Sequence, residues 1–97
     1  MSEKKQITAR RIHVSDLKDN YDRLRERYKS CESFRCYYKK RMEEYHNNYH
    51  EMSTYEFYRD RFLFYRVMVS LLADDLRAAK ERYKQANKEL SMMCQNK

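Results

Sequence analysis

The sequence predicts an all-α fold: a two-helix antiparallel coiled-coil hairpin, completed into a helical bundle by self-association or by a partner. The 97 residues include no Gly and no Pro, which removes most of the turn chemistry that β folds need. Apolar residues recur at alternating spacings of three and four, as in a coiled coil. Hydrophobic residues make up 41 % of the chain, more than disordered chains carry. We therefore expect a single helical domain over residues 1–97.

The first helix is expected over residues 5–46. Its heptad core positions a and d form a series that only Arg10 and Arg35 interrupt. Tyrosine is frequent in this series, so we expect tyrosine rings to pack in the seam between the helices, with their hydroxyls at its edge. The series consists of Ile7, Val14, Leu17, Tyr21, Leu24, Tyr28, Cys31, Tyr38, Met42, Tyr45, Tyr49 and Met52.

The second helix is expected over residues 54–95, after a turn at about 47–53. The step from Met52 to Tyr55 is three residues where the heptad needs four, and Asn47 and Asn48 favour a turn there. The second core series has no gap and consists of Tyr55, Tyr58, Phe62, Tyr65, Val69, Leu72, Leu76, Ala79, Tyr83, Ala86, Leu90 and Met93.

Folding the chain back on itself pairs residues whose numbers add to about 100, so that every a position meets a d position. Tyr38 is then opposite Phe62, and the Arg35 guanidinium would lie on the ring of Tyr65. The rival is one continuous helix in a parallel dimer. That arrangement is disfavoured, because most e and g positions of the first helix are basic and would repel their copies.

A row of apolar residues remains outside the seam. Phe57, Phe64 and Leu71 follow one another at seven-residue spacing, and a two-helix hairpin has no interior for them. A contiguous exposed apolar patch usually marks an interaction site; the alternatives are a frayed N-terminal segment that folds over these residues, or a set of scattered surface aromatics. We expect another helix to dock on this apolar flank, which comprises Phe34, Tyr37, Phe57, Phe64, Met68 and Leu71.

The net charge of +7, with a sequence pI of about 9.4, favours acidic partners. The excess is spread over both helices: residues 1–46 hold 13 basic and 8 acidic side chains, and residues 54–97 hold 9 and 6. Near the turn, a basic cluster could hold phosphates or an acidic protein segment. Its alternative interpretation is a solvated, salt-screened helix end. The basic cluster comprises Lys39, Lys40, Arg41, Arg59 and Arg61.

Catalytic signals are weak. A chain without Gly has no Gly-rich phosphate loop. Glu43 and His46 have the E-x-x-H spacing of di-iron bundles, but the motif occurs once and its heptad positions face outward. We therefore expect no enzyme activity, no catalytic residues, no cofactor and no metal.

The three cysteines, Cys31, Cys36 and Cys94, lack a C-x-x-C spacing, which suits a reducing intracellular compartment, either cytoplasm or nucleus. The longest apolar stretch, residues 62–73, contains Arg66 and is too short to span a membrane. No membrane span is expected.

The expected function is protein–protein interaction and assembly. The chain would act as a small basic coiled-coil adaptor or scaffold subunit, which docks through the apolar flank in a homo-oligomer or a hetero-complex. The alternative is a nucleic-acid-binding helical hairpin that uses the basic cluster, whose affinity would fall steeply with added salt.

Overall fold

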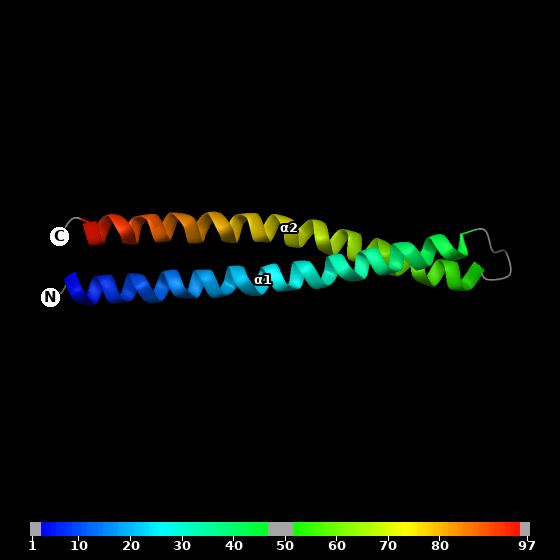
Figure 1. Cartoon of the computed structure of the whole chain (residues 1–97), viewed down its shortest axis with the longest axis horizontal. Coiled ribbons are helices and arrows are strands. Elements are labelled where there is room, and N and C mark those ends of the chain that lie inside the picture. Colours follow the sequence, from blue (N-terminus) through cyan, green and yellow to red (C-terminus); the bar gives the residue numbers. More distant parts are fainter. Residues whose placement is uncertain (1–2, 47–51, 96–97) are drawn as a thin grey trace. The chain divides into compact units, whose positions relative to one another are not determined.

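The computed structural model describes residues 3–46 and 52–95 and contains two long helices, α1 (Glu3–Tyr45) and α2 (Met52–Gln95) (Figure 1). The described residues form no strand. The predicted all-α helical hairpin is thereby confirmed. Residues 47–51 of the expected turn lie outside the described residues. Met52 and Ser53, which were also expected in the turn, are instead the first two residues of α2.

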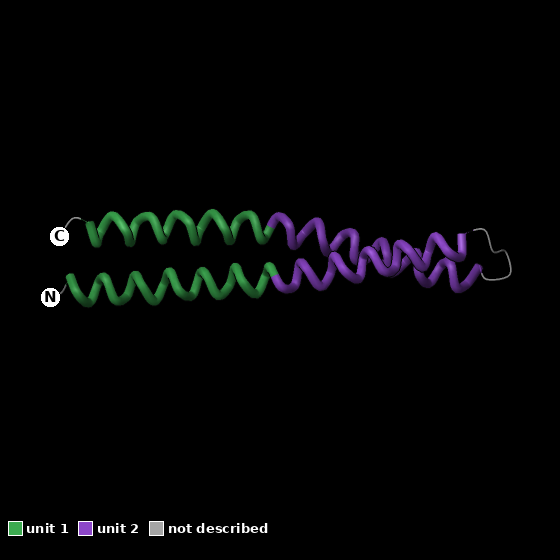
Figure 2. The backbone as a smooth tube through the Cα atoms, viewed as in Figure 1, with its two compact units in different colours: residues 1–25, 75–97 green, residues 26–74 purple. Residues whose placement is uncertain are grey.

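The chain divides into two compact units, each built from a segment of both helices (Figure 2). Unit 1 comprises Met1–Arg25 and Asp75–Lys97, and unit 2 comprises residues 26–74. Within each unit the α1 and α2 segments pack against each other and run in opposite directions. Each unit is therefore an antiparallel helix pair with its own stretch of seam.

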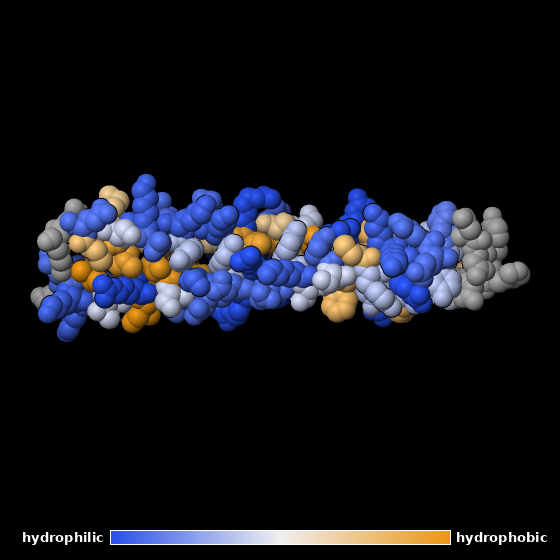
Figure 3. Space-filling view, in the orientation of Figure 1, coloured by the Kyte–Doolittle hydropathy of each residue, from blue (hydrophilic) through white to orange (hydrophobic). Residues whose placement is uncertain are grey.

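The seam follows the two predicted series. Every described member is at least partly buried except Met52, which is 48 % exposed. Among residues 3–46 and 52–95, only Leu72 and Ala79 are fully buried, at 3 % exposure each. Figure 3 shows apolar side chains of unit 1 visible between its two helix segments. A single helix–helix contact thus leaves most of the seam half-buried, where a third or fourth helix would close it.

Ring contacts in unit 2 confirm the predicted register. The ring centroid of Tyr38 lies 5.7 Å from that of Tyr65 and 6.2 Å from that of Tyr58, the two aromatic residues on either side of Phe62 in the second series. The prediction for Arg35 is wrong, because the ring of Phe34 stacks on Tyr65 at 5.2 Å instead.

Arg35 turns to a partner on its own helix. Its Nε donates to Glu32 Oε2 at 3.1 Å, and a second guanidinium nitrogen bonds the other carboxylate oxygen. This hydrogen bonding raises the pKa of Arg35 and holds the pKa of Glu32 below its ordinary value. A carboxylate three residues away satisfies the guanidinium within α1. The ring of Phe34, rather than Arg35, therefore packs against Tyr65 of α2.

In unit 1, the other interruption of the seam also finds an acidic partner. Arg10 Nη1 lies 3.3 Å from Glu89 Oε2, so this ion pair joins α1 to α2. About half of each side chain is exposed. An exposed pair of this kind contributes little to stability, but it keeps the Arg10 charge at the edge of the seam.

The two units differ in charge. Unit 1 holds 13 basic and 7 acidic side chains, a net charge of +6, whereas unit 2 holds 9 basic and 8 acidic, a net charge of +1. The excess that is spread over both helices in the sequence is therefore concentrated in one unit of the fold. The main electrostatic surface therefore belongs to unit 1, whereas the predicted basic cluster belongs to unit 2.

Candidate docking site

Four seam tyrosines lie next to one another in unit 2, and one of them, Tyr65, lines the pocket of the candidate site. Tyr45 stacks on Tyr58 at 5.7 Å, Tyr58 lies 6.2 Å from Tyr38, and Tyr38 stacks on Tyr65 at 5.7 Å. The rings come alternately from α1 and α2. We call this set the tyrosine ladder; its flat, stiff side chains fix the separation of the two helices and the surface above them.

The apolar flank lies entirely in unit 2 and is largely open to solvent. Five of its six residues expose between 48 and 58 % of their surface: Phe34, Tyr37, Phe57, Phe64 and Leu71. Met68, by contrast, is half-buried. Phe57, Phe64 and Leu71 share heptad position c and so lie along one face of α2. The flank is thus a real surface feature, with Met68 at its inner edge.

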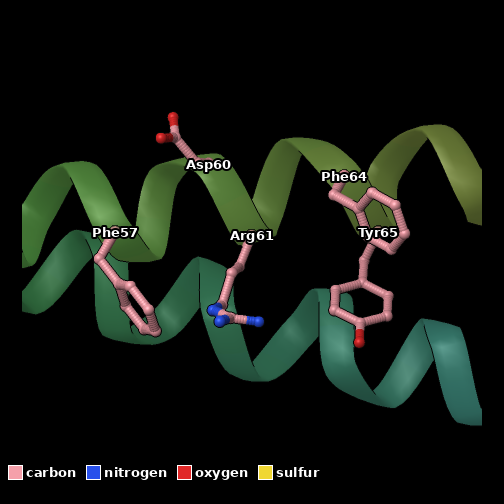
Figure 4. Close-up of a pocket in the computed structure, with 5 residues that line it drawn as sticks. All are labelled: Phe57, Asp60, Arg61, Phe64 and Tyr65. Carbon is pink, nitrogen blue, oxygen red and sulfur yellow. The ribbon is translucent and has the colours of Figure 1, made fainter.

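A pocket of about 370 Å³ opens on this flank, lined by Phe57, Asp60, Arg61, Phe64 and Tyr65. Figure 4 shows Arg61 between the Phe57 and Phe64 positions, with Asp60 pointing away from the other four side chains. The Arg61 guanidinium carbon is 4.4 Å from the Phe57 ring centroid and 5.9 Å from that of Tyr38. The pocket therefore combines aromatic walls with a cation held against them.

This combination of groups suits an apolar side chain accompanied by a carboxylate. The rings offer apolar contact area, and the guanidinium keeps N–H donors for an acidic neighbour. Asp60, at the rim, supplies the opposite charge. The pocket thus sets apolar rings beside one cation and one carboxylate.

Comparisons of the chain with protein-family models, with curated proteins and with solved structures find no match. What the apolar flank binds is therefore inferred from its own residues.

Two more apolar residues of α2 are exposed outside the flank, at heptad positions b and f rather than c. Leu63 and Val67 are 43 and 57 % exposed, and the sequence analysis assigned neither to the site. The sequence does indicate their exposure, because every residue of 62–73 except Arg66 and Ser70 is apolar, so apolar side chains lie on nearly every face of this helix segment. A helix segment that is apolar all round is normally buried on more than one side.

The basic cluster is less available than its sequence indicates. Arg41 is half-buried: it donates to Glu44 at 2.7 Å and to the Tyr58 hydroxyl at 3.4 Å, and its guanidinium lies 5.3 Å from the Tyr58 ring centroid. The hydrogen bond to Tyr58 raises the pKa of Arg41 further above its ordinary value. Arg59 pairs with Asp60 at 3.3 Å. Cations held in this way are poor anion ligands.

Heptad geometry also divides the basic cluster. Lys39 and Arg59 occupy e positions, whereas Arg41 and Arg61 occupy g positions. In an antiparallel pair, e residues face e residues on one side and g residues face g residues on the other. The cluster therefore does not form one continuous patch, although Lys39 and Lys40 are exposed.

Residues 3–46 and 52–95 hold no group of three His, Cys, Asp or Glu side chains that could bind a metal ion. Cys31 is half-buried in the seam, Cys36 and Cys94 are exposed, and all three are free thiols. Neither described helix is long and apolar enough to cross a membrane.

Proposed function

We propose that this chain is an assembly module whose apolar flank docks against the flank of a second copy to form a four-helix bundle. The observation that carries this proposal is the exposed row of Phe57, Phe64 and Leu71 at seven-residue spacing. Such a row is the seam of a helix–helix contact that one hairpin does not make.

The available area supports a second copy as the occupant. A buried aromatic side chain covers roughly 150–250 Å², and the five exposed residues of the flank each retain about half of their surface. They present roughly 500 Å² per copy, or about 1,000 Å² for a pair, before any rim contact is added. A specific interface needs about that much.

The charge distribution also supports a second copy of the chain as the occupant of the apolar flank. Unit 2 has a net charge of only +1, so two copies approaching through this unit meet little repulsion. The pocket carries Arg61 and Asp60 next to each other. If Arg61 of one copy contacted Asp60 of the other, two-fold symmetry would make the same contact a second time with the copies exchanged, as in a self-complementary interface.

Sedimentation velocity over a wide concentration range tests the proposal. The wild-type chain should sediment as a dimer at high concentration, and the double variant Phe64→Asp with Leu71→Asp should remain a monomer, because buried unpaired carboxylates oppose docking. Both residues are exposed, so helicity by circular dichroism should be unchanged.

The matched control is Ser33→Asp with Ser70→Asp, which adds the same two charges at exposed positions outside the flank. This variant should dimerise like the wild type. A wild-type chain that is monomeric at every concentration would exclude a second copy as the occupant. A dimer that survives the Phe64 and Leu71 substitutions would place the interface elsewhere.

A further inference from the structure

One side of unit 1 is lined by cations from both helices. Lys4, Arg11, Lys18 and Arg25 fill four successive e positions of α1. On α2, the e and b positions of the same unit hold three more basic side chains, those of Arg77, Lys80 and Lys84. Because e positions of antiparallel helices share one side of the pair, these residues form a single surface. We call it the basic stripe; it comprises Lys4, Arg11, Lys18, Arg25, Arg77, Lys80 and Lys84, all exposed.

The opposite side of unit 1 has no such excess. Its g and c positions hold basic residues such as Arg23 and Arg82 together with Asp16, Asp75 and Glu89. The charge of unit 1 is therefore strongly one-sided. The α1 row runs from Lys4 to Arg25, which is about 32 Å of helix.

Few of the cations on the basic stripe are neutralised by the protein itself. Lys18 Nζ lies 3.1 Å from Asp22 Oδ2, and this hydrogen bond raises the pKa of Lys18. Within residues 3–46 and 52–95, five members of the stripe have no carboxylate within 4.0 Å: Lys4, Arg11, Arg25, Lys80 and Lys84. By the register of the helices, Lys18 and Lys80 face each other. An external polyanion would relieve this repulsion.

The residues between the cations narrow the class of ligand. At the e and b positions between them stand small or polar residues such as Thr8, Ser15, Asp22, Asn87 and Ser91. Ile12, which is 58 % exposed, lies beside Lys4 and Thr8 at an f position, so the stripe has one bulky apolar neighbour rather than the apolar face that inserts into a lipid leaflet. It also lacks aromatic rings on which unpaired bases could stack. A row of positive charge about 32 Å long therefore suits a ligand with a high density of negative charge along its axis, such as a nucleic-acid duplex.

We infer that the basic stripe binds the phosphate backbone of double-stranded nucleic acid without reading its sequence. A duplex carries one charge per about 1.7 Å of its axis, so the α1 row alone runs beside roughly 19 phosphate charges. The arginines of the stripe add the planar guanidinium that pairs with two phosphate oxygens. This surface lies in unit 1, and it does not depend on the docking function proposed for unit 2.

Fluorescence anisotropy with a labelled duplex of arbitrary sequence tests the inference. If the five cations without a carboxylate partner each meet a phosphate, the logarithm of affinity should fall with the logarithm of salt with a slope of about −4.5. Between about 50 and about 200 mM salt, affinity should then fall about 500-fold. Binding that is absent at the lower salt concentration, or insensitive to salt, would overturn the inference.

Two quadruple variants that each remove four positive charges locate the site. Replacing Lys4, Arg11, Lys80 and Lys84 with Gln, a good helix former, should lower affinity at about 50 mM salt by at least about 30-fold and reduce the slope to about −1. The control replaces Arg23, Arg82, Lys39 and Lys40 with Gln, off the stripe and partly in the basic cluster. It should change affinity less than about 3-fold at the same salt concentration.

The control variant and a second ligand define the contradicting results. An equal loss in both variants would mean that net charge, rather than the basic stripe, drives binding. Tighter binding to vesicles of phosphatidylserine and phosphatidylcholine than to the duplex would assign the stripe to a membrane surface instead. Circular dichroism of both variants checks that the helices are intact.

Discussion

Adjacent leucines in unit 2 provide a direct test of how this chain divides core from flank. Leu72 is 3 % exposed and Leu71 is 54 % exposed, so the same substitution to Ala removes the same atoms from opposite environments. For Leu72→Ala, loss of buried methyl groups and the cavity left behind should lower the free energy of unfolding by about 3 kcal/mol. For Leu71→Ala, the loss in the isolated chain should stay near 0.5 kcal/mol.

Urea unfolding followed by circular dichroism measures both values. With a denaturant slope of about 1.5 kcal/mol per molar, Leu72→Ala should lower the midpoint by about 2 M, and Leu71→Ala by less than about 0.5 M. The measurement belongs at a protein concentration low enough to keep the chain monomeric. Equal losses for the two variants under that condition would refute the assignment of Leu71 to the surface. At high concentration, the proposed docking predicts a larger, concentration-dependent effect of Leu71→Ala.

Two other predictions follow from single contacts. Because Ala79 is 3 % exposed, Ala79→Leu should destabilise unit 1 by about 1–3 kcal/mol through overpacking. The control Ala78→Leu, at an exposed position, should be nearly neutral in the same urea titration. An Ala79→Leu variant as stable as the wild type would contradict close packing at this position. The lowered pKa of Glu32, caused by its hydrogen bond from Arg35, stabilises the fold above the ordinary carboxyl pKa, and this contribution is lost as the pH falls through the lowered value. The melting temperature of the wild type should therefore exceed that of Glu32→Gln at about pH 7, and the difference should shrink progressively as the pH falls below the ordinary carboxyl pKa. A difference independent of pH would exclude the ion pair as its cause.

The seam and its register could be predicted from sequence because burial in a helix pair follows a strict period. Every a or d residue must face the partner helix, so spacing alone determines that Tyr38 meets the region of Phe62. The contact of Arg35 could not be predicted in this way. Its long side chain reaches either Tyr65 or Glu32, and the choice depends on local hydrogen bonding and on where Phe34 packs.

The candidate sites, too, could be predicted from the sequence only in part. The exposure of Phe57 and Phe64 was predictable, because their period places them off the seam. The basic cluster was defined by closeness along the chain and across the turn, and this criterion ignored which side of the pair each heptad position occupies. It also missed the contact of Arg61 with Phe57, at 4.4 Å. The α1 row of the basic stripe can be predicted from four successive e positions. The concentration of the net charge in unit 1 cannot, because it depends on which segments of the two helices pack together.

The tyrosine ladder gives unit 2 a spectroscopic signature of its own. The chain has ten tyrosines and no tryptophan, and eight of the ten fall within residues 26–74. Stacked rings at fixed angles, such as the 7° between Tyr38 and Tyr65, couple their electronic transitions. Near-ultraviolet circular dichroism should therefore follow the packing of unit 2 almost alone, while far-ultraviolet signals report the helices of both units. The melting of the two units can be distinguished without introducing any label.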